Sequence, residues 1–303
     1  LVFSTYATYI VMSFMMLAMI FMLLPQAQVS AERINEVLDR KASIREGSVQ
    51  TGAETGTVEF RNVSFRYPHA SGDALTNIDF KVNRGETLAI IGATGSGKTT
   101  LVQLIPRFYD ATEGAVLIDG VNVKDYSFDA LYDKLGYVTQ KAVLFAGSIR
   151  GNVFFGESAA PDDEANLHDA IALSQAKEFV DKLPEGTDYE IEQLGRNVSG
   201  GQKQRLSIAR ALARKPEILV FDDSFSALDY RTDAKLREGL NRELHDVTKI
   251  IVAQRISTIR HAEKILVLDR GEIAGMGTHD ELMQFCKVYR EIATSQLSAA
   301  ELA

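Results

Sequence analysis

The sequence of 303 residues is long enough for one sizeable domain and an appended segment. Its net charge of -8 at pH 7 argues against a nucleic-acid-binding protein, which depends on a general positive field. Its single cysteine, Cys286, excludes an internal disulfide and is interpreted as a small hydrophobe on an amphipathic helix, and its five histidines lack the spacing of metal ligands.

The chain opens on an apolar segment. Residues 1–24 contain no charged side chain, and about 20 apolar residues in a helix span a bilayer core of ~30 Å. We therefore expect residues 1–40 to be a transmembrane helix with a charged amphipathic extension after Pro25. A signal peptide is not favoured, because there is no basic leader and no small-residue cleavage site. A buried helix of a soluble domain is the alternative, but such helices rarely run this long without a charge. Because the sequence begins inside the apolar run, we expect a fragment of a longer polypeptide.

Residues 41–56 are rich in Ser, Glu, Gly and Thr and are expected to form a linker to a domain at 57–303. The stretch 58–65 alternates like a half-buried strand. Short apolar runs suit strands buried on both faces, and helix-like stretches such as 202–214 lie between them. These runs are 88–91, 218–221, 250–253 and 265–268. The pattern predicts an α/β domain with a parallel sheet and an antiparallel patch near its start.

A glycine-rich segment, 92–99, follows an apolar strand and precedes a helix-like stretch, which is the context of a phosphate-binding loop. Glycines let consecutive N–H groups point at an anion, and the following helix presents its positive end to it. Lys98 supplies a charge for the β- and γ-phosphates, and the Thr99 hydroxyl can bind Mg²⁺. A structural glycine turn, the alternative, would not need Lys-Thr at this place. The predicted ATP-binding residues are Gly92, Thr94, Gly95, Ser96, Gly97, Lys98, Thr99 and Thr100.

A second magnesium-side residue is predicted at the end of another buried strand. The run 219–222 ends in Asp222, which is where a carboxylate would meet the Mg²⁺ of a bound nucleotide. A carboxylate that only caps a turn is the weaker reading beside this loop.

The segment Val198-Ser199-Gly200-Gly201-Gln202, with 203–211 after it, resembles the signature motif of the ATP-binding-cassette (ABC) ATPases. The resemblance implies a P-loop NTPase domain with an antiparallel β subdomain and a helical subdomain. It also implies a head-to-tail dimer in which Ser199, Gly200, Gly201 and Gln202 meet the ATP of the opposite subunit. The serine and the glycine backbone would cap a helix N-terminus that faces the γ-phosphate.

Further matches extend from Val58 to the end of the chain. Tyr67 resembles the aromatic residue that stacks on adenine, although a strand-end surface tyrosine is the alternative. Gln140 resembles the glutamine that contacts Mg²⁺ and senses the membrane domain, and Asp229 resembles the aspartate that crosses the dimer interface. The stretch 141–152 is typical of exporters and would lie near their coupling helices.

The leading segment, 1–38, is similar to the sixth membrane helix of an exporter half-transporter and its cytoplasmic extension. That similarity implies a multi-pass protein of the cell membrane, with five helices absent from this sequence and a cytoplasmic nucleotide-binding domain. The implied partners are the lipid bilayer and an exported small molecule, amphipathic or multidrug-like, and no nucleic acid.

Two departures from the family pattern affect the same step. Asp223 stands where active members have a glutamate that polarises the attacking water, and it is one methylene shorter. A misplacement of about 1 Å can lower a rate on the order of 10²-fold, and a base must come within about 3 Å of its proton. Gln254 replaces the usual switch histidine; its amide can donate a hydrogen bond but cannot become cationic. With Gln140, these are the candidate catalytic residues, and we expect a site that binds ATP and hydrolyses it poorly.

The signature itself is intact, so this chain can complete a competent site on a partner. The stretch 191–196 also differs from the Gly-Glu-rich loop usual in homodimeric exporters. Together these features resemble heterodimeric bacterial multidrug exporters, which implies a second half-transporter carrying the glutamate and the histidine. A homodimeric exporter with slow hydrolysis remains open. A soluble ABC ATPase acting on DNA or ribosomes and an importer ATPase are disfavoured by the apolar N-terminal run.

Overall fold

The computed structural model describes residues 2–156 and 163–296, which divide into two compact units, Leu1–Arg45 and Glu46–Ala303. The first unit contains α1 (Val2–Leu38), a helix of 37 residues that continues through Pro25. It is the one helix in the described residues that is long and apolar enough to cross a membrane, with a mean hydropathy of 2.2 and no buried residue in its apolar window. An apolar surface of this kind needs lipid or other apolar helices to cover it.

The second unit begins with an antiparallel sheet. Its strand order is β2-β1-β4-β5, and inward-facing apolar side chains alternate with exposed ones along β1. Phe60 of β1 stacks on Phe80 of β2, with ring centroids 4.7 Å apart. The strands are β1 (Val58–Phe65), β2 (Leu75–Val82), β4 (Glu113–Ile118) and β5 (Val121–Asn122).

A larger sheet with the strand order β12-β11-β3-β10-β9-β6 forms the centre of the unit. All its strands pair in parallel except β12, which runs antiparallel at the edge. Every residue of β3, β9 and β10 is buried, which explains why most of each strand is an apolar run in the sequence. The strands are β3 (Thr87–Ile91), β6 (Leu135–Val138), β9 (Ile218–Asp222), β10 (Thr248–Val252), β11 (Lys264–Asp269) and β12 (Glu272–Gly277).

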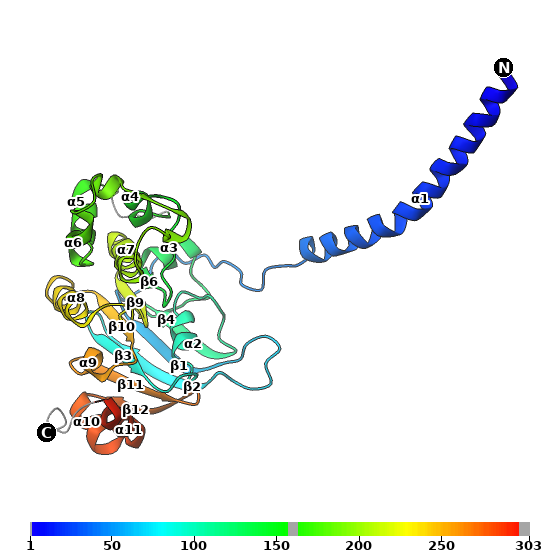
Figure 1. The fold of residues 1–303 in the computed structure, drawn as a ribbon. Coiled ribbons are helices and arrows are strands. Elements are labelled where there is room, and N and C mark those ends of the chain that lie inside the picture. The colour runs from blue at the N-terminus through cyan, green and yellow to red at the C-terminus, as the bar shows by residue number, and fades with distance from the viewer. Residues whose placement is uncertain (1, 157–162, 297–303) are drawn as a thin grey trace. The chain divides into compact units, whose positions relative to one another are not determined.

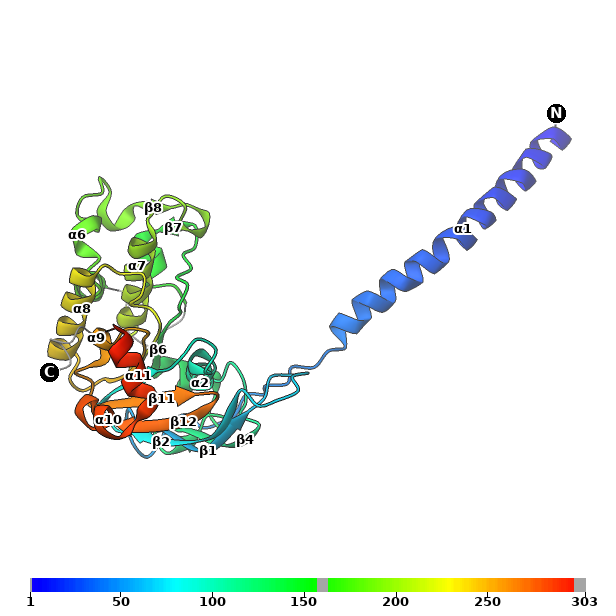
Figure 2. The same cartoon turned by 60° about the horizontal axis from the view of Figure 1, so that its bottom comes forward.

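The helices gather in groups around this sheet. Helices α4, α5 and α6 lie at one end of the unit, and α10 and α11 lie at the other, beside β12 (Figures 1 and 2). The predicted α/β fold with an antiparallel subdomain and a helical subdomain is confirmed. The remaining elements are α2 (Lys98–Gln103), α3 (Phe128–Asp133), β7 (Gly147–Ser148), α4 (Ile149–Val153), α5 (Glu164–Leu173), α6 (Lys177–Val180), η1 (Gly186–Asp188), β8 (Glu190–Ile191), η2 (Gln193–Gly195), α7 (Gly200–Ala213), α8 (Tyr230–Glu243), α9 (Ile256–Ile259), α10 (His279–Phe285) and α11 (Lys287–Gln296).

Main-chain hydrogen bonds hold the start of the second unit. Gly47 N donates to Tyr126 O at 2.9 Å, and Ser127 N donates to Val49 O at 3.0 Å. A Cβ atom on Gly47 would stand 2.1 Å from Asp125 O, so the close approach requires glycine. The expected linker, 41–56, therefore divides at Glu46, where the second unit begins.

The strand order places the candidate site. The loops that follow β3, β10, β9 and β6 all leave the same edge of the sheet, because parallel strands share the side of their carboxyl ends. These four loops carry the phosphate loop, Gln254, Asp223 and Gln140.

Candidate nucleotide-binding site

The phosphate loop joins β3 to α2. Gly95 and Gly97 have φ angles of +80° and +102°, a left-handed backbone that favours glycine. The Lys98 ammonium lies back over the loop, where it donates to Gly92 O and Ala93 O, both at 2.8 Å. Burial lowers the pKa of Lys98, against the opposing effect of the nearby carboxylates. The loop thus curls around its own lysine, with its glycines at the turning points.

The space above this loop suits a nucleotide. A cavity of about 470 Å³ lies there, within the range of ligand pockets. A Cβ atom on Gly95 would meet no atom within 4 Å, so the cavity side of the loop is open. The buried Ser96 hydroxyl of the loop lacks a hydrogen-bond partner among the described residues, so it is available to donate to a bound anion. The cavity is lined by Tyr67, Asp73, Ala74, Gly95, Gly97, Lys98, Thr99, Thr100, Arg270 and Gly271.

Tyr67 forms one wall of this cavity. Its hydroxyl lies 3.0 Å from Thr100 Oγ1, and its ring meets the edge of Tyr109, with centroids 5.2 Å apart. These contacts fix the ring beside the phosphate loop, where an aromatic residue can pack on a nucleobase.

Two further residues that line the cavity, Arg270 and Gly271, were not predicted from the sequence. Arg270 and Gly271 form the turn between β11 and β12, and Gly271 N donates to Ser96 O at 3.1 Å in the phosphate loop. The Asp-Arg-Gly turn signal is visible in the sequence. Its proximity to the phosphate loop is not, because the two segments are far apart along the chain. Asp73, also missed, pairs with Arg66 at 2.8 Å.

Thr99 and Asp222 meet at the side expected for the metal. Thr99 Oγ1 donates to Asp222 Oδ1 at 2.9 Å, and the Tyr137 hydroxyl lies 3.4 Å from Asp222 Oδ2. Burial raises the pKa of Asp222, although these hydrogen bonds oppose the shift. A hydroxyl and a carboxylate are oxygen ligands of the kind Mg²⁺ takes with nucleotide phosphates, so the pair fits that ion. The described residues contain no group of three or more His, Cys, Asp or Glu that could hold a metal without a nucleotide.

Gln140, Asp223 and Gln254 meet one another. The Gln254 Nε2 donates to Asp223 Oδ2 at 2.6 Å, and Gln140 Nε2 donates to the same oxygen at 3.1 Å. Gln140, predicted for both metal and catalysis, thus bonds the second carboxylate and not Asp222. Burial raises the pKa of Asp223, and the two amides oppose this shift. One carboxylate oxygen is therefore occupied by two donors.

The signature residues form the exposed start of α7. Ser199 and Gln202 make a capping box, in which Gln202 N donates to Ser199 Oγ at 3.3 Å and Ser199 N donates to Gln202 Oε1 at 2.8 Å. A Cβ atom on Gly200 would meet nothing within 4 Å, and one on Gly201 would reach only Ala227 O, at 3.4 Å. Asp229 is the N-cap of α8, and its Oδ1 accepts from Thr232 N at 3.0 Å. Within residues 2–156 and 163–296, no hydrogen bond joins these residues to the phosphate loop.

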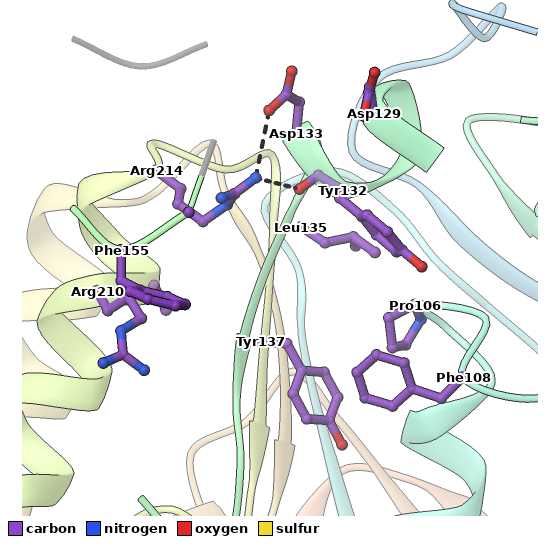
Figure 3. A pocket seen from close by; sticks show the side chains of 12 residues that line it. Pro106, Phe108, Asp129, Tyr132, Asp133, Leu135, Tyr137, Phe155, Arg210 and Arg214 are labelled. Atoms are coloured by element: carbon purple, nitrogen blue, oxygen red, sulfur yellow. Dashed lines mark hydrogen bonds and ion pairs between the residues drawn. The ribbon is translucent and has the colours of Figure 1, made fainter. Parts of the chain in front are cut away.

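A larger groove lies on the other side of Tyr137. Its volume is about 890 Å³, and Figure 3 shows the rings of Tyr137 and Phe108 side by side, in an edge contact with centroids 5.4 Å apart. Arg214 and Asp133, which also line the groove, form an ion pair at 3.4 Å. Since Tyr137 also contacts Asp222, one side chain touches both the groove and the metal-side carboxylate.

The phosphate loop, Asp222 at the end of β9 and the capped signature helix define a nucleotide-binding domain of the ABC type. A family model described as ABC transporter matches residues 75–226, half of the chain, and the chain belongs to this family.

Relatives and solved structures agree with this assignment. The chain is 44% identical over 291 residues to the ABC transporter ATP-binding protein YfiB of Bacillus subtilis, which covers 96% of this chain and 50% of YfiB. It is 42% identical over 254 residues to the ATP-dependent lipid A-core flippase of Xanthomonas oryzae pv. oryzae, covering 84% of this chain and 43% of the flippase. A bacterial Atm1-family ABC exporter with ATP bound superposes with a TM-score of 0.84 at 33% identity, over 93% of this chain and 50% of the exporter. The chain thus spans about half the length of the proteins it matches.

Proposed function

We propose that this chain is the ATP-binding part of an ABC exporter half-transporter and that its own ATP site is slow. The cavity over the phosphate loop, together with Lys98, Thr99 and Asp222, supports ATP binding with Mg²⁺. The likeness to an Atm1-family exporter and to a lipid A-core flippase supports export.

The single observation that carries the slow-site proposal is the hydrogen bonding of the Asp223 carboxylate. Its Oδ2 accepts hydrogen bonds from both Gln254 and Gln140, at 2.6 and 3.1 Å. Two amide donors on one carboxylate oxygen compete with a water for that oxygen, so the water cannot reach it as it would reach a free base. Neither amide can take up the proton of the water in place of the carboxylate. The three side chains therefore hold a bound phosphate and water without an effective base.

We assign the faster chemistry to a partner's site. Gly200 and Gly201 form the N-terminus of the signature helix, which Ser199 caps, and such an N-terminus attracts phosphate. In the proposed heterodimer these residues of this chain complete the ATP site of a second half-transporter. That subunit would carry the glutamate and the histidine that are Asp223 and Gln254 here.

The residues of this chain have distinct roles in the proposed cycle. Lys98, Thr99 and Asp222 hold the phosphates and Mg²⁺, and the ion, when bound, neutralises negative charge on the phosphates. Tyr67 packs on the base. Closure of the two nucleotide domains follows from contacts that exist only when a signature meets the opposite ATP, which is a difference in affinity between two states.

The membrane part of the proposal involves α1 and the groove. We assign α1 as a transmembrane helix of a multi-pass cell-membrane protein, with the nucleotide domain in the cytoplasm, because its apolar length matches a bilayer. We assign the groove beside Tyr137 to the cytoplasmic end of the membrane domain. The cargo we propose is a small amphipathic molecule, supported by the likeness to a lipid A-core flippase.

The test uses the full-length protein purified with its partner. Asp223→Ala should leave most of the ATPase activity, whereas replacing the partner's catalytic glutamate should nearly abolish it. Gln140→Ala, which removes one of the two amides that donate to Asp223, shows how far loss of an amide alone affects the same activity.

Two outcomes would contradict the proposal. Comparable losses from the two carboxylate variants would mean equal sites, as in a homodimeric exporter with slow hydrolysis. A transport-active assembly of this subunit alone would exclude the need for a second, different half.

A further inference from the structure

The end of α11 contacts the loop that carries Gln254. Gln296 Nε2 donates to Gln254 O at 2.8 Å, and Ile256 N donates to Gln296 Oε1 at 2.9 Å. One amide side chain thus bridges two main-chain groups of the loop, as a peptide group of a neighbouring strand would.

This bridge provides a hydrogen-bond acceptor that the loop otherwise lacks for the Ile256 N–H. Ile256 is fully buried and begins α9, and Arg255, the residue before it, provides no side-chain cap. A buried N–H without a partner is costly, so the helix depends on a group from elsewhere. Gln296 supplies that acceptor from a helix about 40 residues further along the chain.

The other side of the same segment is held by α8. Arg237 Nη1 donates to Ser257 O and Thr258 O, both at 3.3 Å, and it pairs with Asp233 at 2.9 Å. The segment after Gln254 is therefore fixed between two helices, and α11 controls the end that is nearer to the site.

The contacts continue into the site. The main chain of Gln254 accepts from Gln296, and its side chain donates to Asp223 at 2.6 Å. We propose that Gln296 is a positioning residue: it fixes the main chain of Gln254 so that the Gln254 amide stays at Asp223, and a site held in this way releases a bound nucleotide more slowly. This inference rests on the proposed function, since it concerns how long ATP remains at the slow site.

The test is a double-mutant cycle in the full-length heterodimer. The phosphate-loop lysine of the partner is replaced, so that labelled ATP binds only at this chain's site, and its release is followed after a chase with unlabelled ATP. Gln296→Ala and Gln254→Ala should each speed release roughly three- to tenfold, as expected for the loss of one or two hydrogen bonds. The double variant should release ATP no faster than Gln254→Ala, because Gln296 acts through that residue.

Matched variants separate positioning from general loosening. Ser295→Ala is the control, because among the described residues the Ser295 hydroxyl bonds only Ile292 O of its own helix, at 2.7 Å. Gln296→Glu keeps the acceptor for Ile256 N but loses the donor to Gln254 O. In hydrogen exchange, the Ile256 amide should exchange faster in Gln296→Ala, less so in Gln296→Glu, and unchanged in Ser295→Ala.

The outcomes distinguish this inference from the proposed function. Additive effects in the double variant, or release unaffected by Gln296→Ala, would overturn the positioning role even if the site is slow. Rapid hydrolysis at this site with a non-additive cycle would overturn the slow site and leave the positioning role intact.

Discussion

Asp223 has a backbone conformation and neighbours that both suit a short carboxylate. Its φ angle is +49°, in the left-handed region where Asp and Asn are several-fold more frequent than most other residues. Its Oδ2 lies within reach of two amides. The glutamine at 254 and the aspartate at 223 are thus matched to each other, which is why two departures from the family pattern act as one feature.

The buried Asp222 carboxylate should destabilise the nucleotide-free domain at neutral pH. Because burial raises its pKa, the folded state holds the proton more tightly than the unfolded chain does. Stability therefore falls as pH rises from the ordinary carboxyl pKa through the raised one, and it stays lower above it. In the unit 46–303, we expect Asp222→Asn to raise the melting temperature by about 2–4 °C at pH 8, and less as the pH falls toward 4.

The same variant should lose most of the stabilisation that Mg²⁺ and ATP give to the wild type. A ligand that binds only the folded state stabilises it more the more tightly it binds, and the variant lacks the metal-side carboxylate. Asp169→Asn, at an exposed position of α5, is the control and should change neither measurement. A melting temperature for Asp222→Asn below the wild-type value at pH 8 would contradict the assigned sign.

At the scale of elements, the cap of α7 has a structural role, and we propose a functional role beside it. Ser199→Ala removes the side-chain acceptor of the capping box and should cost about 1 kcal/mol of stability. It should also lower turnover at the partner's site several-fold while ATP binding to this chain is unchanged. ATPase assays and chemical denaturation of the same preparations measure the two effects.

Thr278 provides the matched control for this variant. Thr278 and Glu281 form the same kind of capping box at α10, so Thr278→Ala should cost similar stability and leave turnover unchanged. Equal losses of turnover from the two variants would reduce Ser199 to a purely structural cap.

The sequence predicts the helices, strands and loops better than it predicts which of them lie next to one another in the fold. The runs that became β3, β9 and β10 are apolar because both faces of these strands are buried, so they were recognisable. The phosphate loop and the signature were recognisable because their glycines and caps are local. The meeting of Gln140, Asp223 and Gln254 depends on the order β10-β9-β6, which no local pattern encodes.

Side chains that act across long sequence separations were not predictable for the same reason. Gln296 reads as an ordinary polar residue of an amphipathic helix, and its role depends on where α11 ends. The segment from Glu46 has the composition of a linker. Its Gly47 nevertheless serves a close approach to Asp125, and not flexibility.

At the scale of the whole molecule, the function we propose separates ATP retention from ATP hydrolysis. The phosphate loop of the chain borders a cavity that suits ATP, and in the proposed assembly its signature residues at the start of α7 serve another subunit. An ATP that persists at this site would keep the two nucleotide domains associated between turnovers.

Retention should therefore be unequal in the assembled heterodimer. After rapid removal of free nucleotide, we expect about one ATP per heterodimer, because only the slow site keeps it intact.

Restoring both family residues, with Asp223→Glu and Gln254→His together, should abolish this retention. It should also raise ATPase activity about ten- to hundredfold when the partner's glutamate is absent, since the longer carboxylate regains roughly 1 Å of reach and the imidazole can carry a proton. Asp223→Glu or Gln254→His alone should raise ATPase activity much less, because the unchanged residue of the pair is not matched to the new side chain. Filter binding with ATP labelled on the γ-phosphate measures the retained nucleotide. Two retained ATP molecules, or none, in the wild-type assembly would show that the sites are equivalent.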